Sequence, residues 1–187
     1  MTAFMAKIVS RILLGMLFAH ASQYAVAQTR LTVSQALDFW ISRSEEMVVA
    51  TVEAMPEEKY SFAPTAGEFV GVRTFAQQAK HLAANNYRMA AYILGERPTP
   101  EQVSETGPEA ARSKAQIVAY VQGSFAVLHR AMAVINEQNM LEPLNIPLSQ
   151  KTRLQLAEDV VAHSSNHYGQ MVEYLRMNGI VPPTSRK

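Results

Sequence analysis

The chain has 187 residues, of which 48% are hydrophobic and 18% are charged. This length and composition fit one compact domain with a sizeable core. The formal net charge is +1 at pH 7 and no basic run occurs, so nothing electrostatic points to nucleic acid or to an anionic membrane surface. The absence of cysteine excludes disulfides, a protein thiolate nucleophile and thiolate metal ligands.

Residues 1–27 have the features of a secretory signal peptide. Lys7 and Arg11 form a basic start, an apolar run extends from Ile12 to Ala19, and Ala25-Val26-Ala27 supplies the small residues of a cleavage site. The alternative is an uncleaved membrane anchor, but the apolar run is shorter than the ~20 residues that a spanning helix needs. We therefore expect a periplasmic or secreted protein without a stable membrane span after cleavage.

Cleavage would leave residues 28–187 as the mature domain. Without Lys7 and Arg11 the basic side chains fall from 17 to 15, against 16 acidic ones, a net charge of −1. An exported chain without disulfides must derive its stability from packing.

Two helices are expected in the first half of this domain, because apolar residues recur there at helical spacing. The first begins at Thr32 or Ser34 and ends at Pro56. After a long connector, the second begins at Thr74, a good N-cap with a glutamine three positions later, and stops at Gly95.

Two further helices are expected in the second half. The third covers 109–138, with Pro108 as an early helical residue. The fourth opens at Ser149 or Thr152 and ends at Gly179, which two prolines follow. Four long helices without a convincing strand or repeat predict an all-α fold, an antiparallel four-helix bundle with two long connections.

The chemistry of this bundle is expected at three of the five histidines. His163 and His167 lie four positions apart and therefore share one helix face. A bundle builds its sites from facing helices, and the second helix carries His81. Three neutral imidazoles with an open fourth position form a catalytic type of zinc site.

The spacing by itself is not specific, since the glutamate of a zincin motif is missing. Three incidental histidines on amphipathic helices are the alternative, and these would share no focus. Asp159 is expected either to accept a ring N–H of His163 or to be solvated. Gly169 is expected to allow close approach of a neighbouring helix, and His129 is interpreted as an ordinary surface or packing residue.

Two stretches resemble the DinB-like (DinB/YfiT-like) superfamily of small, bundle-forming metalloenzymes. They are KYSFAPTAGEFVGVRTFAQQAKHLAANNY, with a histidine in mid-helix, and the ending HSSNHYGQMVEYLRMNGIVPP. The ending matches the family pattern H-x-x-x-H-x-G-Q-x-x-x-Y-L-R-x-x-G-x-x-P-P. The likeness extends from about Leu31 to Pro183, and the signal peptide would make the chain an exported member.

The resemblance implies that His81, His163 and His167 are metal ligands. Zinc is the first choice of divalent ion, although nickel, iron and copper also accept imidazole. Family members with known activities are transferases or isomerases that depend on a metal and a low-molecular-weight thiol. The same site would therefore direct an external thiol at a small-molecule substrate. Family members tend to pair through helix faces, so the resemblance also implies a homodimer.

The signal peptide favours other activities as well, since an exported protein meets an oxidising compartment. A hydrolase that uses a metal-activated hydroxide would need no thiol. A non-enzymatic periplasmic metal-binding or stress protein on the same bundle is the alternative from a different class. The sequence does not distinguish these three functions.

Overall fold

The computed structural model describes residues 30–64, 71–148 and 152–186. The expected signal peptide, residues 1–27, lies outside the described residues. The chain divides into two units, Met1–Leu31 and Thr32–Lys187, and the second contains every described helix. None of the helices in the described residues is long and apolar enough to cross a membrane.

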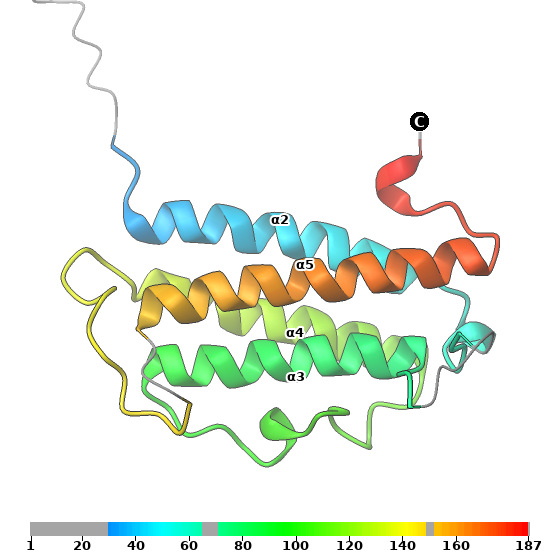
Figure 1. The fold of residues 1–187 in the computed structure, drawn as a ribbon, viewed down its shortest axis with the longest axis horizontal. Helices are drawn as coiled ribbons and strands as arrows, with labels where there is room; N and C mark the ends of the chain where they lie inside the picture. Colours follow the sequence, from blue (N-terminus) through cyan, green and yellow to red (C-terminus); the bar gives the residue numbers. More distant parts are fainter. Residues whose placement is uncertain (1–29, 65–70, 149–151, 187) are drawn as a thin grey trace, which may run out of the picture. The chain divides into compact units, whose positions relative to one another are not determined.

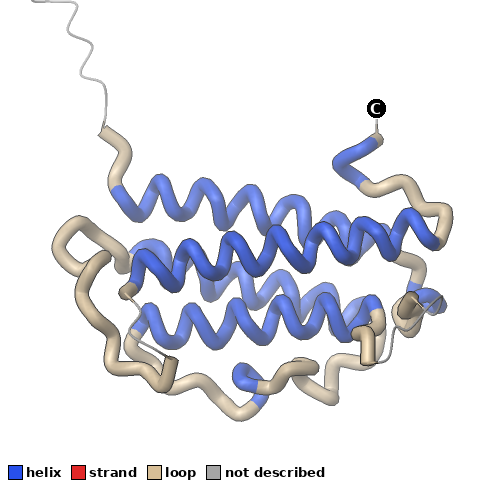
Figure 2. Tube along the Cα trace, viewed as in Figure 1, coloured by secondary structure: helices blue, strands red, loops and turns tan. Residues whose placement is uncertain are grey.

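Four helices form the second unit (Figures 1 and 2), and its described residues contain no strand. They are α2 (Val33–Ala54), α3 (Phe75–Leu94), α4 (Lys114–Ala133) and α5 (Arg153–Met177). Short 3-10 turns lie in the connections and after α5, at Glu57–Lys59, Glu101–Val103 and Pro183–Ser185. The predicted all-α four-helix bundle is confirmed.

Each helix packs against two neighbours, with α2 and α3 both contacting α4 and α5. Helices α3 and α5 run antiparallel, since Gln78 bonds to Gln170 near one end and Arg153 bonds to the Ile93 carbonyl near the other. Helices α2 and α4 are also antiparallel, and α3 and α4 run in the same direction (Figure 1). The connection between α3 and α4 therefore passes along the bundle from one end to the other.

Side-chain caps fix where the helices begin. In each of the four, the N-cap hydroxyl accepts from the backbone N–H three residues later, and a glutamine there bonds back to the N-cap N–H. These reciprocal bonds satisfy amides that have no partner within the helix. The N-cap residues are Thr32, Thr74, Ser113 and Thr152.

The predicted bounds of the third helix, 109–138, are wrong at both ends. Helix α4 starts at Lys114 because Ser113 caps it, and Lys80 of α3 donates to the Ala111 carbonyl in the preceding turn. The helix ends at Ala133, and Asn139 Nδ2 donates to the Val134 carbonyl at this end. Side chains outside the helical pattern thus shorten the helix at both ends.

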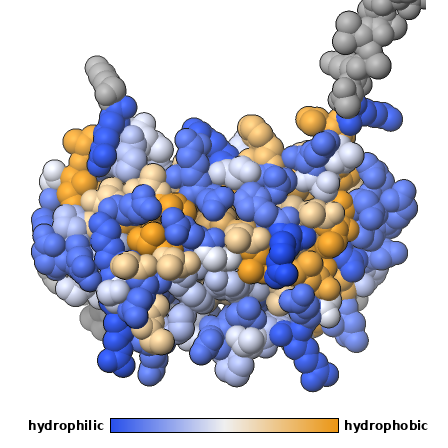
Figure 3. Space-filling view, turned by 180° about the vertical axis from the view of Figure 1, so that it is seen from behind, coloured by the Kyte–Doolittle hydropathy of each residue, from blue (hydrophilic) through white to orange (hydrophobic). Residues whose placement is uncertain are grey.

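The core lies between the four helices and contains side chains from each of them. The largest fully buried ones are Phe75, Phe125, Ile41, Met55, Leu82, Ile93, Ile117, Leu128, Met132, Ile135, Leu156 and Met171. On the face shown in Figure 3, hydrophobic residues remain visible between hydrophilic ones. The burial of large side chains supplies the stability that disulfides cannot provide in this chain.

Two glycines differ in what they allow. A Cβ on Gly123 of α4 would collide with the hydroxyl of Tyr87. The lack of a side chain at this position therefore allows Tyr87 of α3 to pack against α4. A Cβ on Gly169 would meet no atom within 4 Å. The expectation that Gly169 allows a close helix approach is therefore wrong.

His129 connects α4 to α2 and is more than a surface residue. Its Nε2 lies 3.0 Å from Glu45 Oε2, and its Nδ1 bonds to Asp38. Burial lowers the pKa of His129, but the hydrogen bonds and charges of the two carboxylates outweigh burial and raise it above its usual value. Protonated His129 therefore links the two helices.

The raised pKa of His129 predicts a pH-dependent stability. Protonated His129 contributes fully to the free energy of unfolding below its pKa in the unfolded chain, about 6.5. This contribution is lost as pH rises through the higher pKa of His129 in the folded protein. Urea unfolding at about pH 6 should give a higher free energy of unfolding for wild type than for His129→Gln. At about pH 9 the two free energies should be equal. The difference should be on the order of 1 kcal/mol or less, because these side chains are partly exposed. An equal difference at both pH values would contradict the assignment.

Candidate metal centre

The bundle brings the three histidines singled out from the sequence to one place. His81 projects from α3, and His163 and His167 project from α5. Their candidate ligand atoms all lie within 4.8 Å of one another, and Nε2 of His163 is 3.2 Å from Nε2 of His81. Among the described residues, no other histidine and carboxylate group of three or more meets this criterion. Three unrelated histidines would not share such a focus.

The ring of His81 is held by the connection between α3 and α4. Its Nδ1 lies 2.9 Å from the backbone carbonyl of Glu105 and 3.2 Å from the Glu105 carboxylate. Since both partners are acceptors, Nδ1 carries the proton and Nε2 keeps its lone pair. The lone pair of Nε2 therefore faces His163 Nε2, at 3.2 Å, in the place where a metal would bind.

The ring of His167 is held by an amide chain that crosses from α3 to α5. Its Nδ1 lies 2.7 Å from Gln78 Oε1, and Gln78 Nε2 donates to Gln170 Oε1 at 2.7 Å. The second bond fixes Gln78 with its oxygen toward His167, so Nδ1 is the donor and Nε2 is again free. Sequence reasoning missed Gln78, although its position three residues before His81 places it on the same side of α3.

The ring of His163 is less constrained. Its Nδ1 is buried and has no hydrogen-bond partner among the described residues. The expected bond from Asp159 to this ring is therefore not formed. Asn85, one helical turn after His81 on α3, accepts a hydrogen bond from Arg88 at 2.7 Å.

The surroundings keep all three imidazoles neutral. Burial is the main cause, and it lowers the pKa of His163 to about 4 and that of His167 to about 3, with further lowering from the neighbouring histidines and Arg73. The pKa of His81 is also lowered, again mainly by burial. Near neutral pH the site thus presents uncharged nitrogens, the form that binds metal.

A divalent ion fits this group of residues. Three neutral imidazoles offer lone pairs to one region, and two of them have the N–H···O partner that metal-bound histidines usually have. The chain offers no thiolate, and no carboxylate of the described residues joins the group that could hold an ion. Such a donor set leaves coordination positions open for a small molecule.

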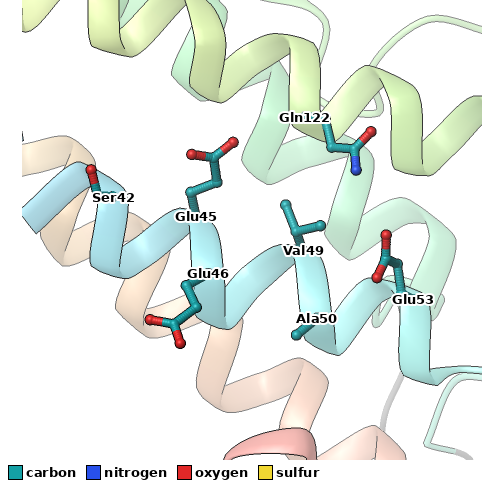
Figure 4. A pocket seen from close by; sticks show the side chains of 7 residues that line it. All are labelled: Ser42, Glu45, Glu46, Val49, Ala50, Glu53 and Gln122. Atoms are coloured by element: carbon teal, nitrogen blue, oxygen red, sulfur yellow. The ribbon is translucent and has the colours of Figure 1, made fainter.

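Another hollow, of about 330 Å³, lies along α2 and does not resemble a metal site. It contains three glutamates, and Figure 4 shows Glu45 and Glu46 pointing to different sides of the helix. Glu45 binds His129 and Glu46 binds Arg43, so both have partners of their own. These carboxylates do not converge on one point.

The fold and this site define a class of protein, a four-helix bundle with three converging histidines on two facing helices. The DinB superfamily model matches residues 41–171, and the chain belongs to this superfamily. The membership expected from the two quoted stretches is confirmed. No curated protein matches the chain.

Three solved structures share the fold at low sequence identity. A DinB-like protein from Bacillus cereus has a TM-score of 0.65 at 16% identity, covering 81% of this chain and 96% of that one. A DinB-like protein from Bacillus subtilis has a TM-score of 0.61 at 14% identity, covering 77% of this chain and 92% of that one. A conserved protein from Enterococcus faecalis has a TM-score of 0.62 at 15% identity, covering 79% of this chain and 98% of that one. At these identities the likeness concerns the fold alone.

Gln78 gives a prediction about metal affinity. Replacing it by methionine keeps the side-chain length but removes the acceptor that orients His167. We expect Gln78→Met to weaken zinc binding by about 10–100-fold, as measured by competition with a chromophoric chelator. Gln122→Met, on the exposed side of α4, is the matched control. Equal zinc affinity in both variants would show that Gln78 does not orient the ligand.

Proposed function

We propose that this chain is a divalent-metal-dependent enzyme acting on a small molecule. His81, His163 and His167 would hold the ion, and zinc is the preferred metal because three imidazoles suit it, with nickel, iron and copper as alternatives. One observation carries the proposal: neutral imidazoles from α3 and α5 lie with their candidate ligand atoms within 4.8 Å of one another.

The bound ion would lower the pKa of a water or thiol that reaches it. The chain's own residues keep the ligand rings in place, with the proton of His81 on the side of Glu105 and that of His167 on the side of Gln78. With no cysteine in the chain, a thiol would have to be an external cofactor. The proposal therefore covers a thiol-dependent transferase and a hydrolase that activates water.

A non-enzymatic metal-binding or stress protein is the competing function. Export to the periplasm or beyond, proposed from residues 1–27, favours it together with the hydrolase, because reduced thiols are scarce there. A homodimer is also proposed. Its support is a nearly apolar hollow of about 340 Å³ between α2 and α5, next to the half-exposed Trp40. The mass of the mature protein in solution tests the homodimer.

Cobalt substitution distinguishes an enzyme site from a closed site. Cobalt(II) replaces zinc in the tag-free protein, and 2-mercaptoethanol or azide is then added while the absorption spectrum is recorded. We expect new thiolate-to-cobalt charge-transfer absorption, because three protein ligands leave a position open. A spectrum unchanged by both additives would indicate a closed site and contradict the enzyme proposal. With an open site, stimulation of turnover by thiol separates transfer from hydrolysis.

A further inference from the structure

We propose that Arg73 and Arg88 form a carboxylate-binding subsite beside the three histidines, and that the Glu105 side chain occupies it in place of a substrate carboxylate. The inference rests on the proposed function and adds the substrate class, a small molecule with a carboxylate group. It follows from the contacts of Glu105, from unpaired donors next to it and from the charge of the site.

A single carboxylate joins both arginines to the metal centre. Glu105 Oε2 lies 3.0 Å from Arg73 Nη2 and 3.2 Å from His81 Nδ1, and Oε1 lies 3.9 Å from Arg88 Nη1. Glu105 comes from the connection between α3 and α4, whereas Arg88 and His81 are on α3 itself. The site therefore already accommodates a carboxylate that the helices do not supply.

The Glu105 side chain can move out of the subsite without disturbing His81. It is 61% exposed, and ion pairs of this kind contribute about 1 kcal/mol or less. His81 has a separate bond, 2.9 Å from its Nδ1 to the backbone carbonyl of Glu105, which does not involve the carboxylate. A ligand carboxylate could replace the side chain while His81 keeps its orientation.

Donors beside Glu105 have no acceptor. Arg88 Nε and Asn85 Nδ2 are both buried without a hydrogen-bond partner among the described residues. The two side chains are joined by the bond from Arg88 Nη2 to Asn85 Oδ1, and Asn85 is only 4% exposed. Unpaired buried donors are costly, and an acceptor that reached them would remove this cost. Arg88 is therefore pre-positioned and still has binding capacity.

The charge of the site also favours an anion. The guanidinium groups of Arg73 and Arg88 carry two positive charges, and the Glu105 carboxylate, which contacts both, carries one negative charge. The sum is positive, and it becomes more positive when the Glu105 side chain moves away. A positive site of this kind attracts anionic ligands in preference to neutral ones.

Glutarate binding to the full chain tests the subsite, by calorimetric titration of both the zinc-loaded and the metal-free protein, with neutral glutaramide as the comparison ligand. We expect Arg88→Gln to weaken glutarate binding at least about tenfold, since a charge-assisted hydrogen bond is lost. Glu105→Gln should tighten it about threefold or more, because the arginines lose their internal partner. Arg97→Gln, exposed in the same connection, should leave it unchanged.

Equal glutarate affinity in wild type and Arg88→Gln would overturn the subsite, as would a Glu105→Gln variant that binds no more tightly than wild type. Arg73→Gln gives a second reading in case Arg88→Gln fails to fold. Metal analysis separates the two proposals. Arg88-dependent glutarate binding in a chain that never takes up metal would retain the subsite and reject the metal enzyme. Metal uptake together with glutarate binding that does not depend on Arg88 would retain the metal enzyme and reject the subsite.

Discussion

His163→Ala should remove the metal from this protein almost completely. Wild type reconstituted with zinc should retain about one ion per chain after gel filtration, and the variant should retain close to none. Loss of a group that only orients a ligand already costs about 10–100-fold in affinity, and loss of a ligand should exceed that. Elemental analysis of the tag-free protein is the measurement.

The reason lies in the geometry of α5. Without the ring of His163, the site keeps His81 and His167, and the described residues place no other histidine or carboxylate in the group that could replace the missing nitrogen. His129→Ala is the matched control, since this histidine binds Asp38 and Glu45 on another face of the bundle. Full zinc retention in His163→Ala, with an unchanged circular dichroism spectrum, would disprove the three-histidine centre.

Phe125→Ala should give the largest loss of stability. Phe125 is fully buried in α4, which packs against both α2 and α3. Truncation removes the transfer free energy of the ring and leaves a cavity that the helices can close only in part. We expect the free energy of unfolding to fall by about 3–5 kcal/mol, a large share of the roughly 5–15 kcal/mol of a typical domain.

Urea unfolding followed by circular dichroism measures this loss. Phe39→Ala is the control, because Phe39 is 62% exposed on α2 and should change stability by about 0.5 kcal/mol or less. The slope with urea should stay constant if both variants unfold in two states. A loss below about 1 kcal/mol for Phe125→Ala would mean that the bundle repacks around the gap.

Much of the fold could be read from local patterns. Thr74 with Gln77, and Gly95 at the other end, fixed the bounds of α3 correctly, since a capping box and a glycine with φ of 75° act within a few residues. The start of α4 has the same local pattern, Ser113 with Gln116 three residues later, but the prediction from Pro108 placed the start too early. Only the bond that holds the preceding turn is remote in sequence, since Lys80 lies 31 residues from its acceptor, the Ala111 carbonyl.

The site shows the same division. The positions of His163 and His167 determined that two imidazoles share a face of α5, and the bundle pattern with His81 predicted the third. Only the tertiary structure supplied Gln78 as the partner of His167 and showed that His163 Nδ1 has no bond to Asp159, one of the two alternatives for this residue. Spacing along a helix says which side chains share a face, but not which atoms of another helix lie opposite them.

Four helices, the type of bundle, the family and the three histidines that meet could thus be predicted from the sequence, whereas both ends of α4 were predicted wrongly. The tertiary structure decided which ring nitrogen of His81 and of His167 carries the proton, and which charged groups surround the site. Glu105 is 24 residues from His81 and 32 from Arg73 along the chain, and its contacts exist only because the connection between α3 and α4 lies against α3. No local pattern encodes such a contact, because it forms only when distant segments pack together.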